Sequence, residues 1–558
     1  MKKNNHKYIF VIGGVMSGVG KGVSTASFGT ILKSKGFRVS LIKADPYLNV
    51  DAGTMNPTEH GEVFVLHNGL ETDQDMGNYE RFLNEDMPPE NYMTNGMIFK
   101  YVIDKERALG YKGKCVEPVY HITEEILRRI EESVKKTKSD ITVFEIGGTV
   151  GEYQNAIFLE AARILKLRHP DDVMVVLVSY LPVPNNLGEM KTKPTQNAVR
   201  QLNSYGLNAD MIIARSEVML DEKRKEKIAI STGVPARNVI SAPDIDSIYE
   251  VPINFEKDGL SKQVLSFFKL APRKKDLVEW RAMIKRMKSP KTEVKIAVVG
   301  KYFDTGDFTL SDAYISVIEA LKFSAGAEKT KVTLSWVNAK KFETNTLPIE
   351  SLKEYDGIIV PGGFGESGIE GKLMAIRFAR ENNIPYFGLC YGMQLAVIEY
   401  ARNVLGIADA NTGEIDPEGE HLVIDIMPDQ KKKLEDGNYG GSMRLGVYPC
   451  VLKKGTVASE AYSDSKSYKL QAPSFKLINE RHRHRYEVNN AYIEELEKAG
   501  LVFSGTSPDG TLMEIAELPR KTHPFFVGTQ FHPEFLARPL APHPLFTAFI
   551  KAALKRKT

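Results

Sequence analysis

Short apolar runs alternate with helical stretches in this chain, and the alternation occurs twice. In the first half the runs are YIFVI, RVSLIK, ITVFEI, VMVVLVS and ADMIIA, which are rich in Val and Ile and lack polar alternation. This pattern is typical of strands that are buried on both faces of a parallel sheet. The alternation restarts later with VKIAVVG, DGIIVPGG and IPYFGLC. We therefore predict two α/β domains, each a doubly wound and mostly parallel sheet with helices on both faces.

A basic segment separates the two halves. In residues 271–293, APRKKDLVEWRAMIKRMKSPKTE, the side chains of Leu277, Trp280, Ile284 and Met287 fall on one helical face. The segment predicts an interdomain linker helix between a domain over 1–270 and a domain over 294–558. The length of 558 residues agrees with this division, because single cores stop growing beyond about 250–300 residues.

The composition excludes several classes of protein. The chain has 74 basic and 71 acidic residues, a net charge of +3, which gives no reason to expect nucleic acid or an anionic membrane as partner. The longest apolar stretch, Val173–Val183, is too short to span a bilayer. The three cysteines are scattered and odd in number, so a disulfide framework is disfavoured and a cytoplasmic location is expected.

A glycine-rich stretch, GGVMSGVGKG, follows the first predicted strand and precedes a predicted helix that ends on Gly36. This order suits phosphate binding, because glycines allow close backbone approach and the helix N-terminus carries partial positive charge. The stretch departs from the strict P-loop pattern, since Val15 and Gly22 stand where Gly and Ser or Thr are required. By itself it is consistent with a nucleotide site or with a plain glycine-rich turn.

Further residues in the first half favour a nucleotide site with a metal ion. Lys43 and Asp45 end the second predicted strand, at the edge where open α/β sheets bind ligands. Asp75 lies in an acidic loop and Glu145 at a strand end, and carboxylates beside a phosphate loop favour Mg²⁺, which takes oxygen ligands. A solvated acidic loop is the alternative for Asp75. The stretch at 188–199, GEMKTKPTQNAV, suits a triphosphate, although such lysine–threonine runs are also common on surfaces.

The second half contains a candidate nucleophile. Cys390 lies between a predicted strand and a predicted helix, which is the position of a nucleophile elbow. His532 and Glu534 in GTQFHPEF complete a Cys–His–Glu set suited to acyl transfer, and Gly362 and Gly363 offer backbone N–H groups for an oxyanion. A buried structural cysteine is the alternative. The stretch RHRHRYEVNN is disfavoured as a metal or RNA site, because it lacks Cys or carboxylates at ligand spacing.

Several motifs occur in the same order as in the CTP synthase family. They are GGVMSGVGKG, KADPYLNVDAGTMNPTEHGEVFV, ETDQDMGNYERF, EIGGTVGE, KTKPTQ and DIDSIY, and the second half resembles a class I glutamine amidotransferase. This resemblance covers nearly the whole chain. It implies a P-loop-like (dethiobiotin-synthetase-like) synthase domain followed by a glutaminase domain. The implied enzyme is a carbon–nitrogen ligase that aminates UTP to CTP in pyrimidine biosynthesis, using ATP, ammonia from glutamine and a 4-phosphorylated UTP intermediate.

The resemblance also implies roles for individual residues. Cys390, His532 and Glu534 would be catalytic, Asp75 and Glu145 would hold Mg²⁺, and His60 would face the ammonia entry. Glutamine binding is implied for Gly362, Gly363, Tyr391, Gly392, Met393, Gln394, Glu414 and Arg485. ATP binding is implied for Gly18, Val19, Gly20, Lys21, Gly22, Val23, Lys43, Asp75, Arg215, Pro243, Asp244 and Ile245. UTP and CTP binding is implied for Ser17, Glu152, Tyr153, Gln154, Lys191, Thr192, Lys193, Pro194, Thr195, Gln196 and Lys227.

Regulation and assembly are implied by the same resemblance. We expect a homotetramer, feedback inhibition by CTP and activation by GTP, and the sequence leaves open whether filaments form. Glu152, Tyr153 and Gln154 replace the family's usual Asp-Ile-Glu, which predicts altered CTP feedback. Ser367 replaces an arginine tied to GTP activation, which predicts weak or altered activation by GTP.

Two other functions fit parts of the sequence. One is another P-loop amidoligase with a fused glutaminase, such as a cobyrinic acid amidase. The KTKPTQ segment argues against it, because a large acidic corrin has no need of a triphosphate site. The other is a nucleotide-gated filament protein without catalysis, which the intact set of Cys390, His532 and Glu534 disfavours.

Overall fold

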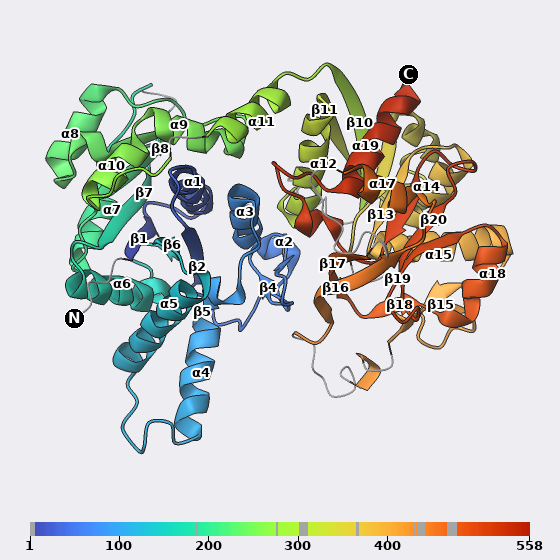
Figure 1. Cartoon of the computed structure of the whole chain (residues 1–558), viewed down its shortest axis with the longest axis horizontal. Helices are drawn as coiled ribbons and strands as arrows, with labels where there is room; N and C mark the ends of the chain where they lie inside the picture. Colours follow the sequence, from blue (N-terminus) through green and yellow to red (C-terminus); the bar gives the residue numbers. More distant parts are fainter. Residues whose placement is uncertain are drawn as a thin grey trace. The chain divides into compact units, whose positions relative to one another are not determined.

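The chain forms two compact units. The computed structural model describes residues 6–184, 188–274, 277–300, 311–363, 368–427, 430–432, 441–465 and 477–557 (Figure 1). The first unit comprises Met1–Ala52 and Asp75–Arg281, and the second comprises Gly53–Gln74 and Ala282–Thr558. The units differ from the predicted domain ranges in one segment, Gly53–Gln74, which lies in the second unit although it precedes most of the first in sequence.

The first unit is built on a seven-stranded sheet in the order β5-β2-β6-β1-β7-β8-β9. All neighbouring strands in it are parallel. The strands are β1 (Lys7–Gly13), β2 (Val39–Asp45), β5 (Tyr92–Thr94), β6 (Ile141–Thr149), β7 (Val173–Tyr180), β8 (Met211–Ser216) and β9 (Val239–Pro243). Their carboxyl ends therefore lie along one edge of the sheet, the edge at which α/β proteins bind ligands.

Helices cover both faces of this sheet. On one face Phe10, Ile42 and Phe144 pack in a core with residues of α4 to α8. On the other face α1 contacts β2, β6 and α9, and it lies so close to Leu41 that a Cβ at Gly29 would come within 3.0 Å of that side chain. The helices are α1 (Lys21–Ser34), α3 (Gln74–Leu83), α4 (Asn95–Arg107), α5 (Thr123–Thr137), α6 (Ala156–Arg168), α7 (Lys193–Ser204), α8 (Glu222–Thr232), α9 (Val251–Lys257) and α10 (Leu260–Phe267).

The second unit contains a nine-stranded sheet in the order β11-β10-β12-β13-β21-β20-β19-β16-β17. From β11 to β21 the strands are parallel, and the remaining strands continue the sheet in antiparallel pairs. They are β10 (Thr292–Gly300), β11 (Thr330–Asn338), β12 (Gly357–Val360), β13 (Tyr386–Leu389), β16 (Arg444–Leu452), β17 (Leu477–His484), β19 (Val502–Thr506), β20 (Met513–Leu518) and β21 (Phe526–Thr529). A smaller sheet holds β14 (Asn411–Thr412), β15 (Leu422–Ile426) and β18 (Tyr486–Val488).

Helices also cover both faces of the parallel part of the second sheet. Ala297 and Ile358 pack with residues of α14 and α15 on one face. On the other, α12 and α19 contact each other, and the ring of Phe387 lies 5.0 Å from that of Phe546. The helices are α12 (Ile315–Ala327), α13 (Lys340–Glu343), α14 (Ile369–Glu381), α15 (Tyr391–Tyr400), α17 (Val457–Asp464), α18 (Ile493–Lys498) and α19 (Pro544–Lys557).

The segment Gly53–Gln74 carries α2 (Pro57–His60) and the hairpin of β3 (Phe64–Val65) with β4 (Glu71–Thr72). Arg481 donates a hydrogen bond to the Val65 carbonyl at 3.0 Å, and the Phe64 ring lies 5.1 Å from the Phe535 ring. The buried carboxylate of Glu62 accepts a hydrogen bond from the Ser316 backbone N–H at 3.1 Å. These contacts explain why the segment belongs to the second unit.

The predicted helix near the domain boundary is confirmed as α11 (Val278–Lys288). Leu277, Trp280 and Ile284 are buried as their spacing predicts, and the Trp280 indole donates to the Tyr249 carbonyl at 2.7 Å. The division between the two units falls inside α11, after Arg281. The strands that apolar runs predict are all present. Strands β5, β9, β11, β16, β17, β19, β20 and β21 correspond to none of the predicted runs. Among the described residues, no helix is long and apolar enough to cross a membrane.

A close backbone contact in the second unit gives a test of its packing. A Cβ at Gly371, in α14, would lie 1.9 Å from the Ala339 carbonyl oxygen. Because that oxygen belongs to the backbone, Gly371→Ala should destabilise the second unit by about 1–3 kcal/mol, and calorimetry should show a lower midpoint of its thermal unfolding. The matched change Met374→Ala, at a side chain of the same helix that is 37 % exposed, should leave the midpoint almost unchanged. An unchanged midpoint for Gly371→Ala would contradict the tight packing of α14.

Candidate active sites

The predicted nucleotide residues gather at the carboxyl edge of the first sheet. The glycine-rich loop follows β1, and Lys43 and Asp45 end β2. Glu145 on β6 is paired in register with Lys43, and Arg215 lies near the end of β8. Parallel pairing thus brings together residues that are far apart in sequence.

The glycine-rich loop has an unusual backbone. Val15, Gly18 and Gly20 have φ angles of 78°, 71° and 89°, a left-handed conformation that turns successive N–H groups toward one side and forms anion-binding concavities. Gly20 caps α1, and the next residue, Lys21, is 8 % exposed. Burial lowers the pKa of Lys21. The loop therefore has the backbone form and the cation that a phosphate site requires.

Gly22 stands where a P-loop has Ser or Thr, and the structure gives a reason. A Cβ at Gly22 would lie 2.1 Å from Oδ1 of Asp75, the second residue of α3. The Asp75 carboxylate thus occupies the space into which a serine or threonine side chain would project. A carboxylate oxygen from another helix therefore lies where the hydroxyl group would be.

Carboxylates surround Lys43. Its Nζ lies 2.5 Å from Asp75 Oδ2, 2.8 Å from Glu145 Oε1 and 3.6 Å from Asp45 Oδ1, and Tyr79 donates a hydrogen bond to Glu145. Burial raises the pKa of Glu145 and of Asp45. Burial also opposes the charge of Asp75, but the Lys43 ammonium outweighs it and lowers the pKa of Asp75. The cluster offers oxygen ligands of the kind that Mg²⁺ prefers.

A cavity of about 190 Å³ opens beside the loop in the first unit. Gly20, Val23 and Ser24 form one wall, and the guanidinium of Arg215 contacts Asp244 Oδ1 at 2.9 Å in another. The remaining lining residues are Ala242, Pro243, Ile245, Ile248, Val251, Asn254 and Phe255. Six predicted ATP positions therefore line a single, partly apolar cavity, which suits a nucleobase better than a phosphate.

The residues predicted for UTP and CTP differ in exposure. Thr192 and Thr195 are buried at the start of α7, and the Thr195 hydroxyl lies 2.8 Å from that of Ser179 on β7. Glu152 accepts a hydrogen bond from the Thr149 backbone N–H at 2.8 Å, whereas Tyr153 is 99 % exposed. Ser17, Gln154, Lys193 and Lys227 are exposed, and Lys191, Pro194 and Gln196 are half-buried. Their roles stay predictions.

Cys390 stands on a sharp turn between β13 and α15. Its φ and ψ are 49° and −101°, a strained conformation of the kind found at nucleophile elbows. Its backbone N–H donates to the Thr529 carbonyl at 2.6 Å. A Cβ at Gly392 would lie 2.2 Å from the Val360 carbonyl oxygen, so the turn needs glycine at that position. The predicted elbow is present, and Cys390 is 5 % exposed.

His532 and Glu534 lie beside the cysteine. The His532 Nδ1 contacts Glu534 Oε1 at 2.7 Å, and the imidazole stacks on the Phe535 ring with centroids 5.0 Å apart. Burial opposes the charge of His532, but Glu534 and the Cys390 sulfur outweigh it and raise the pKa of His532 to about 10. The imidazole can therefore hold a proton at neutral pH, and a cation beside a cysteine sulfur favours the thiolate form that nucleophilic attack requires.

Cys390, His532 and Glu534 line a cavity of about 430 Å³ within the second unit. Gly362 lies against His532 and Cys390, since a Cβ at Gly362 would lie 3.0 Å from His532 Cε1 and 3.7 Å from Cys390 Cβ. The other lining residues are Gly53, Thr54, Met55, Pro57, Glu62, Val63, Ala313, Tyr314, Val317, Gly363, Met443, Arg483, Arg485 and Phe535. Three of the residues predicted to bind glutamine, Gly362, Gly363 and Arg485, thus face the predicted nucleophile. Tyr391, Gly392, Met393, Gln394 and Glu414 are not among the lining residues, and their role stays a prediction.

Sequence reasoning missed one wall of this cavity. Residues 53–63 read as part of the synthase half, yet they line the cavity that holds Cys390. Arg483 was also missed, although its guanidinium contacts Glu71 at 2.8 Å and its carbonyl lies 3.8 Å from the Cys390 sulfur. No local signal predicts these contacts, because Glu71 and Arg483 lie 412 positions apart in the chain and Cys390 and Arg483 lie 93 apart. His60 is exposed on α2 in this segment, and its role stays a prediction.

Comparisons with known proteins show the family of the chain. Residues 7–270 match the family model of the CTP synthase N-terminus, and residues 309–552 match that of class I glutamine amidotransferases. The chain belongs to the CTP synthase family. Proteins named CTP synthase from Caldanaerobacter subterraneus, Carboxydothermus hydrogenoformans and Pyrococcus furiosus are 50 %, 48 % and 48 % identical to it, with 98–99 % of each chain covered in every pair. A solved glutaminase domain of Trypanosoma brucei CTPS with bound acivicin is 38 % identical, covers 47 % of this chain and 94 % of its own, and has a TM-score of 0.41.

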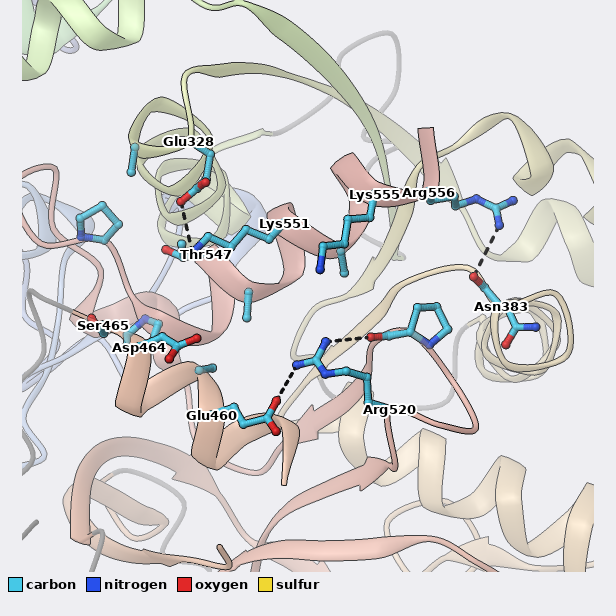
Figure 2. A pocket seen from close by; sticks show the side chains of 17 residues that line it. Glu328, Asn383, Glu460, Asp464, Ser465, Arg520, Thr547, Lys551, Lys555 and Arg556 are labelled. Carbon is cyan, nitrogen blue, oxygen red and sulfur yellow. Dashed lines mark hydrogen bonds and ion pairs between the residues drawn. The ribbon is translucent and has the colours of Figure 1, made fainter. Parts of the chain in front are cut away.

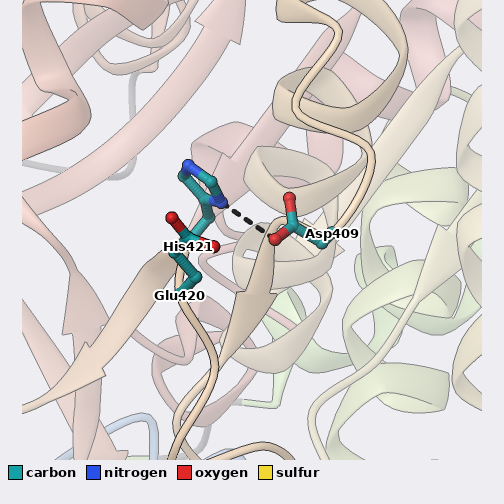
Figure 3. Close-up of side chains that lie close together, drawn as sticks. All are labelled: Asp409, Glu420 and His421. Atoms are coloured by element: carbon teal, nitrogen blue, oxygen red, sulfur yellow. Dashed lines mark hydrogen bonds and ion pairs between the residues drawn. The ribbon is translucent and has the colours of Figure 1, made fainter.

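Two other features are less suited to the chemistry of a CTP synthase. A cavity of about 940 Å³ in the second unit is lined by paired charges, among them Arg520 with Glu460 at 3.0 Å and Lys551 with Glu328 at 3.6 Å (Figure 2). Asp409, Glu420 and His421 form a compact group of potential metal ligands at the surface of the described chain (Figure 3). Neither contains a residue that the family resemblance places in a site.

The pairing of His532 with Glu534 predicts a pH effect. Glu534→Gln removes the negative charge that holds the His532 pKa high, so the imidazole loses its proton at a lower pH and the thiolate loses its cationic partner. The midpoint of Cys390 alkylation by iodoacetamide should move to higher pH, with a rate at pH 7 about tenfold lower. Peptide mass spectrometry distinguishes alkylation of Cys390 from alkylation of the exposed Cys115, and the pH dependence of Cys115 alkylation should not change. A Cys390 profile equal to that of the wild type would refute the ion pair.

Proposed function

We propose that this chain aminates UTP to CTP, using ATP to activate the uracil O4 and glutamine as the source of ammonia. The observation that carries the proposal is that Cys390, His532 and Glu534 meet in one cavity, in a chain whose other unit gathers a glycine-rich loop, lysines and carboxylates at one sheet edge. Residues 1–270 would form the synthase domain, 271–293 the linker and 294–558 the glutaminase domain. The segment 53–74, although part of the synthase range in sequence, would serve the glutaminase cavity.

Glutamine would be hydrolysed in the second unit. The Cys390 thiolate attacks the side-chain amide carbon of glutamine, and backbone N–H groups at Gly362 and Gly363 donate hydrogen bonds to the developing oxyanion. His532 gives its proton to the leaving nitrogen, so that ammonia and a glutamyl thioester form. Water then hydrolyses the thioester to glutamate, with His532 as the base, and Glu534 keeps the imidazole oriented throughout.

ATP and UTP would meet at the edge of the first sheet. Lys21 and Lys43 stabilise negative charge while the γ-phosphoryl group passes to the uracil O4. Ammonia then displaces phosphate from C4 and leaves CTP. The cavity beside Arg215 suits the base of ATP, and the start of α7, with Lys191, Thr192 and Thr195, suits the phosphates of UTP or CTP.

The residues beside the glycine-rich loop fit magnesium. Asp75 and Glu145 would hold the ion, because both offer carboxylate oxygens beside the loop and Asp75 fills the place of the usual hydroxyl ligand. When bound, magnesium neutralises charge on the phosphates of ATP. The lowered pKa of Asp75 favours the ionised carboxylate, which is the form that binds a cation.

Regulation and assembly follow the family. CTP would act as a feedback inhibitor, GTP as an activator, and the chain as a homotetramer. The wholly exposed ring of Tyr153 lies among the residues that distinguish this chain from its family at the CTP site. Ser367, on which altered GTP activation depends, lies outside the described residues. The matches over both units favour this function over a cobyrinic acid amidase or a filament protein without catalysis.

An amination assay with two nitrogen sources tests this function. The wild-type protein should convert UTP to CTP with ATP and Mg²⁺, using glutamine or ammonium. Cys390→Ala should lose more than about 99 % of the glutamine-dependent rate, a loss of ~10²-fold or more, because no nucleophile remains. The ammonium-dependent rate of the same variant should equal that of the wild type. Chromatographic measurement of CTP checks both rates. Loss of both activities together would contradict the division of labour between the units, and no CTP from the wild type would refute the function.

The contact between Gly22 and Asp75 predicts that restoring a P-loop residue is harmful. Gly22→Ser and Gly22→Ala both place a Cβ 2.1 Å from the Asp75 carboxylate, so each should displace it and lower the ammonium-dependent rate at least about tenfold (~1.4 kcal/mol). Equal losses for both variants indicate steric displacement. A Gly22→Ser enzyme with nearly normal activity would instead mean that its hydroxyl replaces Asp75 as a ligand.

A further inference from the structure

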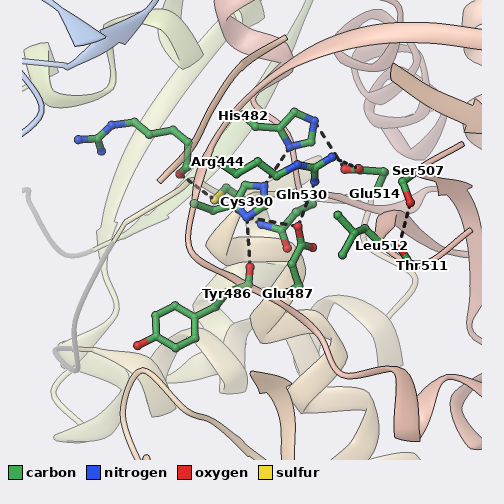
Figure 4. Close-up of polar contacts among 12 residues, drawn as sticks. Cys390, Arg444, His482, Tyr486, Glu487, Ser507, Thr511, Leu512, Glu514 and Gln530 are labelled. Atoms are coloured by element: carbon green, nitrogen blue, oxygen red, sulfur yellow. Dashed lines mark hydrogen bonds and ion pairs between the residues drawn. The ribbon is translucent and has the colours of Figure 1, made fainter. Parts of the chain in front are cut away.

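The sulfur of Cys390 has a polar neighbour that the family resemblance does not assign to the site. The side-chain Nε2 of Gln530 lies 3.7 Å from Cys390 Sγ, within hydrogen-bonding distance for sulfur. Gln530 is fully buried and is not among the residues that line the glutamine cavity. It therefore contacts the sulfur from the protein interior (Figure 4). His532, in contrast, lines the same cavity as the cysteine.

The orientation of the Gln530 amide is determined by its other partners. Gln394 donates from its Nε2 to Gln530 Oε1 at 3.3 Å, and also to the Tyr486 carbonyl at 3.0 Å. Because Gln530 Oε1 faces this donor, its NH₂ group must face the sulfur. The Gln530 backbone N–H donates to the Glu514 carbonyl at 2.8 Å, which holds the residue against β20. Gln394 itself lies one turn after Cys390 on α15, with its backbone N–H bonded to the Cys390 carbonyl at 3.2 Å.

The other groups around the Cys390 sulfur determine how much a neutral N–H donor adds to the stability of its thiolate. Across the cavity, Cys390 faces His532, Glu534, Arg483, Arg485 and Glu62. Arg483 also places its backbone carbonyl oxygen 3.8 Å from the sulfur. This oxygen accepts a hydrogen bond from a thiol but repels a thiolate. An N–H donor on the same sulfur favours the thiolate instead, and Gln530 supplies one.

Behind Gln530 the charges are paired and buried. Arg444 contacts Glu487 at 3.0 Å and Glu514 at 2.8 Å (Figure 4). His482 and His484 lie within 3.0 Å of each other, and burial lowers the pKa of both, so that they remain neutral. The interior side of the sulfur therefore presents an oriented amide dipole, backed by one guanidinium and two buried carboxylates whose pKa burial raises.

We propose that Gln530 is a catalytic residue that stabilises the Cys390 thiolate through an N–H···S hydrogen bond, and that Gln394 is a positioning residue that orients its amide. The proposal rests on Cys390 being the nucleophile of glutamine hydrolysis.

Substitution of Gln530 by methionine tests the proposal, because methionine keeps the size of the side chain but has no N–H donor. In Gln530→Met the thiolate loses its donor, so the midpoint of Cys390 alkylation by iodoacetamide should rise by about one pH unit, and glutamine-dependent kcat at pH 7 should fall about tenfold. Part of this loss should be recovered at higher pH. The ammonium-dependent rate and the alkylation profile of the exposed Cys115 should not change, which shows that the protein is folded.

Two further variants separate the outcomes. Gln530→Glu, which nearly keeps the shape but adds a negative charge, should shift the alkylation midpoint further than Gln530→Met. Gln394→Met should cause a smaller shift of the same sign, because the Gln530 amide then rotates. A wild-type alkylation profile and kcat in Gln530→Met would overturn the proposal. If Cys390→Ala kept its glutamine-dependent activity, the nucleophile assignment itself would be wrong, which is a different result.

Discussion

Parallel strand pairing is the constraint on which both sites depend. In a parallel sheet every strand ends at the same edge, so side chains that follow different strands meet there whatever their distance in sequence. In the first unit this brings the loop after β1, Lys43 at the end of β2, Glu145 on β6 and Arg215 on β8 to one edge. In the second unit the same geometry places Cys390 after β13 beside the segment that follows β21 and carries His532 and Glu534. The antiparallel strands add the wall that holds Arg483 and Gln530's partner Glu514.

The close approach of a carboxylate to the backbone explains two glycines that motif rules leave unexplained. At Gly22 and at Gly53 a carboxylate oxygen lies 2.1 Å from the position of a Cβ, from Asp75 in one case and Glu71 in the other. Asp75 lies in α3, and Glu71 lies three residues before this helix. Asp75 contacts Lys43, and Glu71 contacts Arg483. In each unit, therefore, a charged group approaches the backbone so closely that any side chain would displace it. The departure of GGVMSGVGKG from the P-loop pattern at position 22 is a consequence of this packing.

Chain connectivity links the two chemistries. The segment 53–74 leaves the first unit shortly after Asp45, forms one wall of the cavity around Cys390, and returns to the first unit at Asp75. Glu71, which pairs with Arg483, is thus only a few residues from the proposed magnesium ligand Asp75. Phe64 of the same segment contacts Phe535, which stacks on His532. One wall of the glutaminase cavity is therefore formed by a segment that the chain connects, before and after it, to residues of the synthase unit.

The sequence by itself determined the two α/β units, the family, and the residues that carry local motifs. Apolar runs and glycine-rich turns are short-range signals, and α11 shows its buried face through a spacing of three or four residues. Only the tertiary structure decided that residues 53–74 belong to the second unit, that Asp75 takes the place of the hydroxyl missing at Gly22, and that Gln530 touches the sulfur of Cys390. These contacts join residues 50 to more than 400 positions apart. No local pattern specifies them, because they follow from how the sheets order their strands and from which side chains the packed core leaves room for.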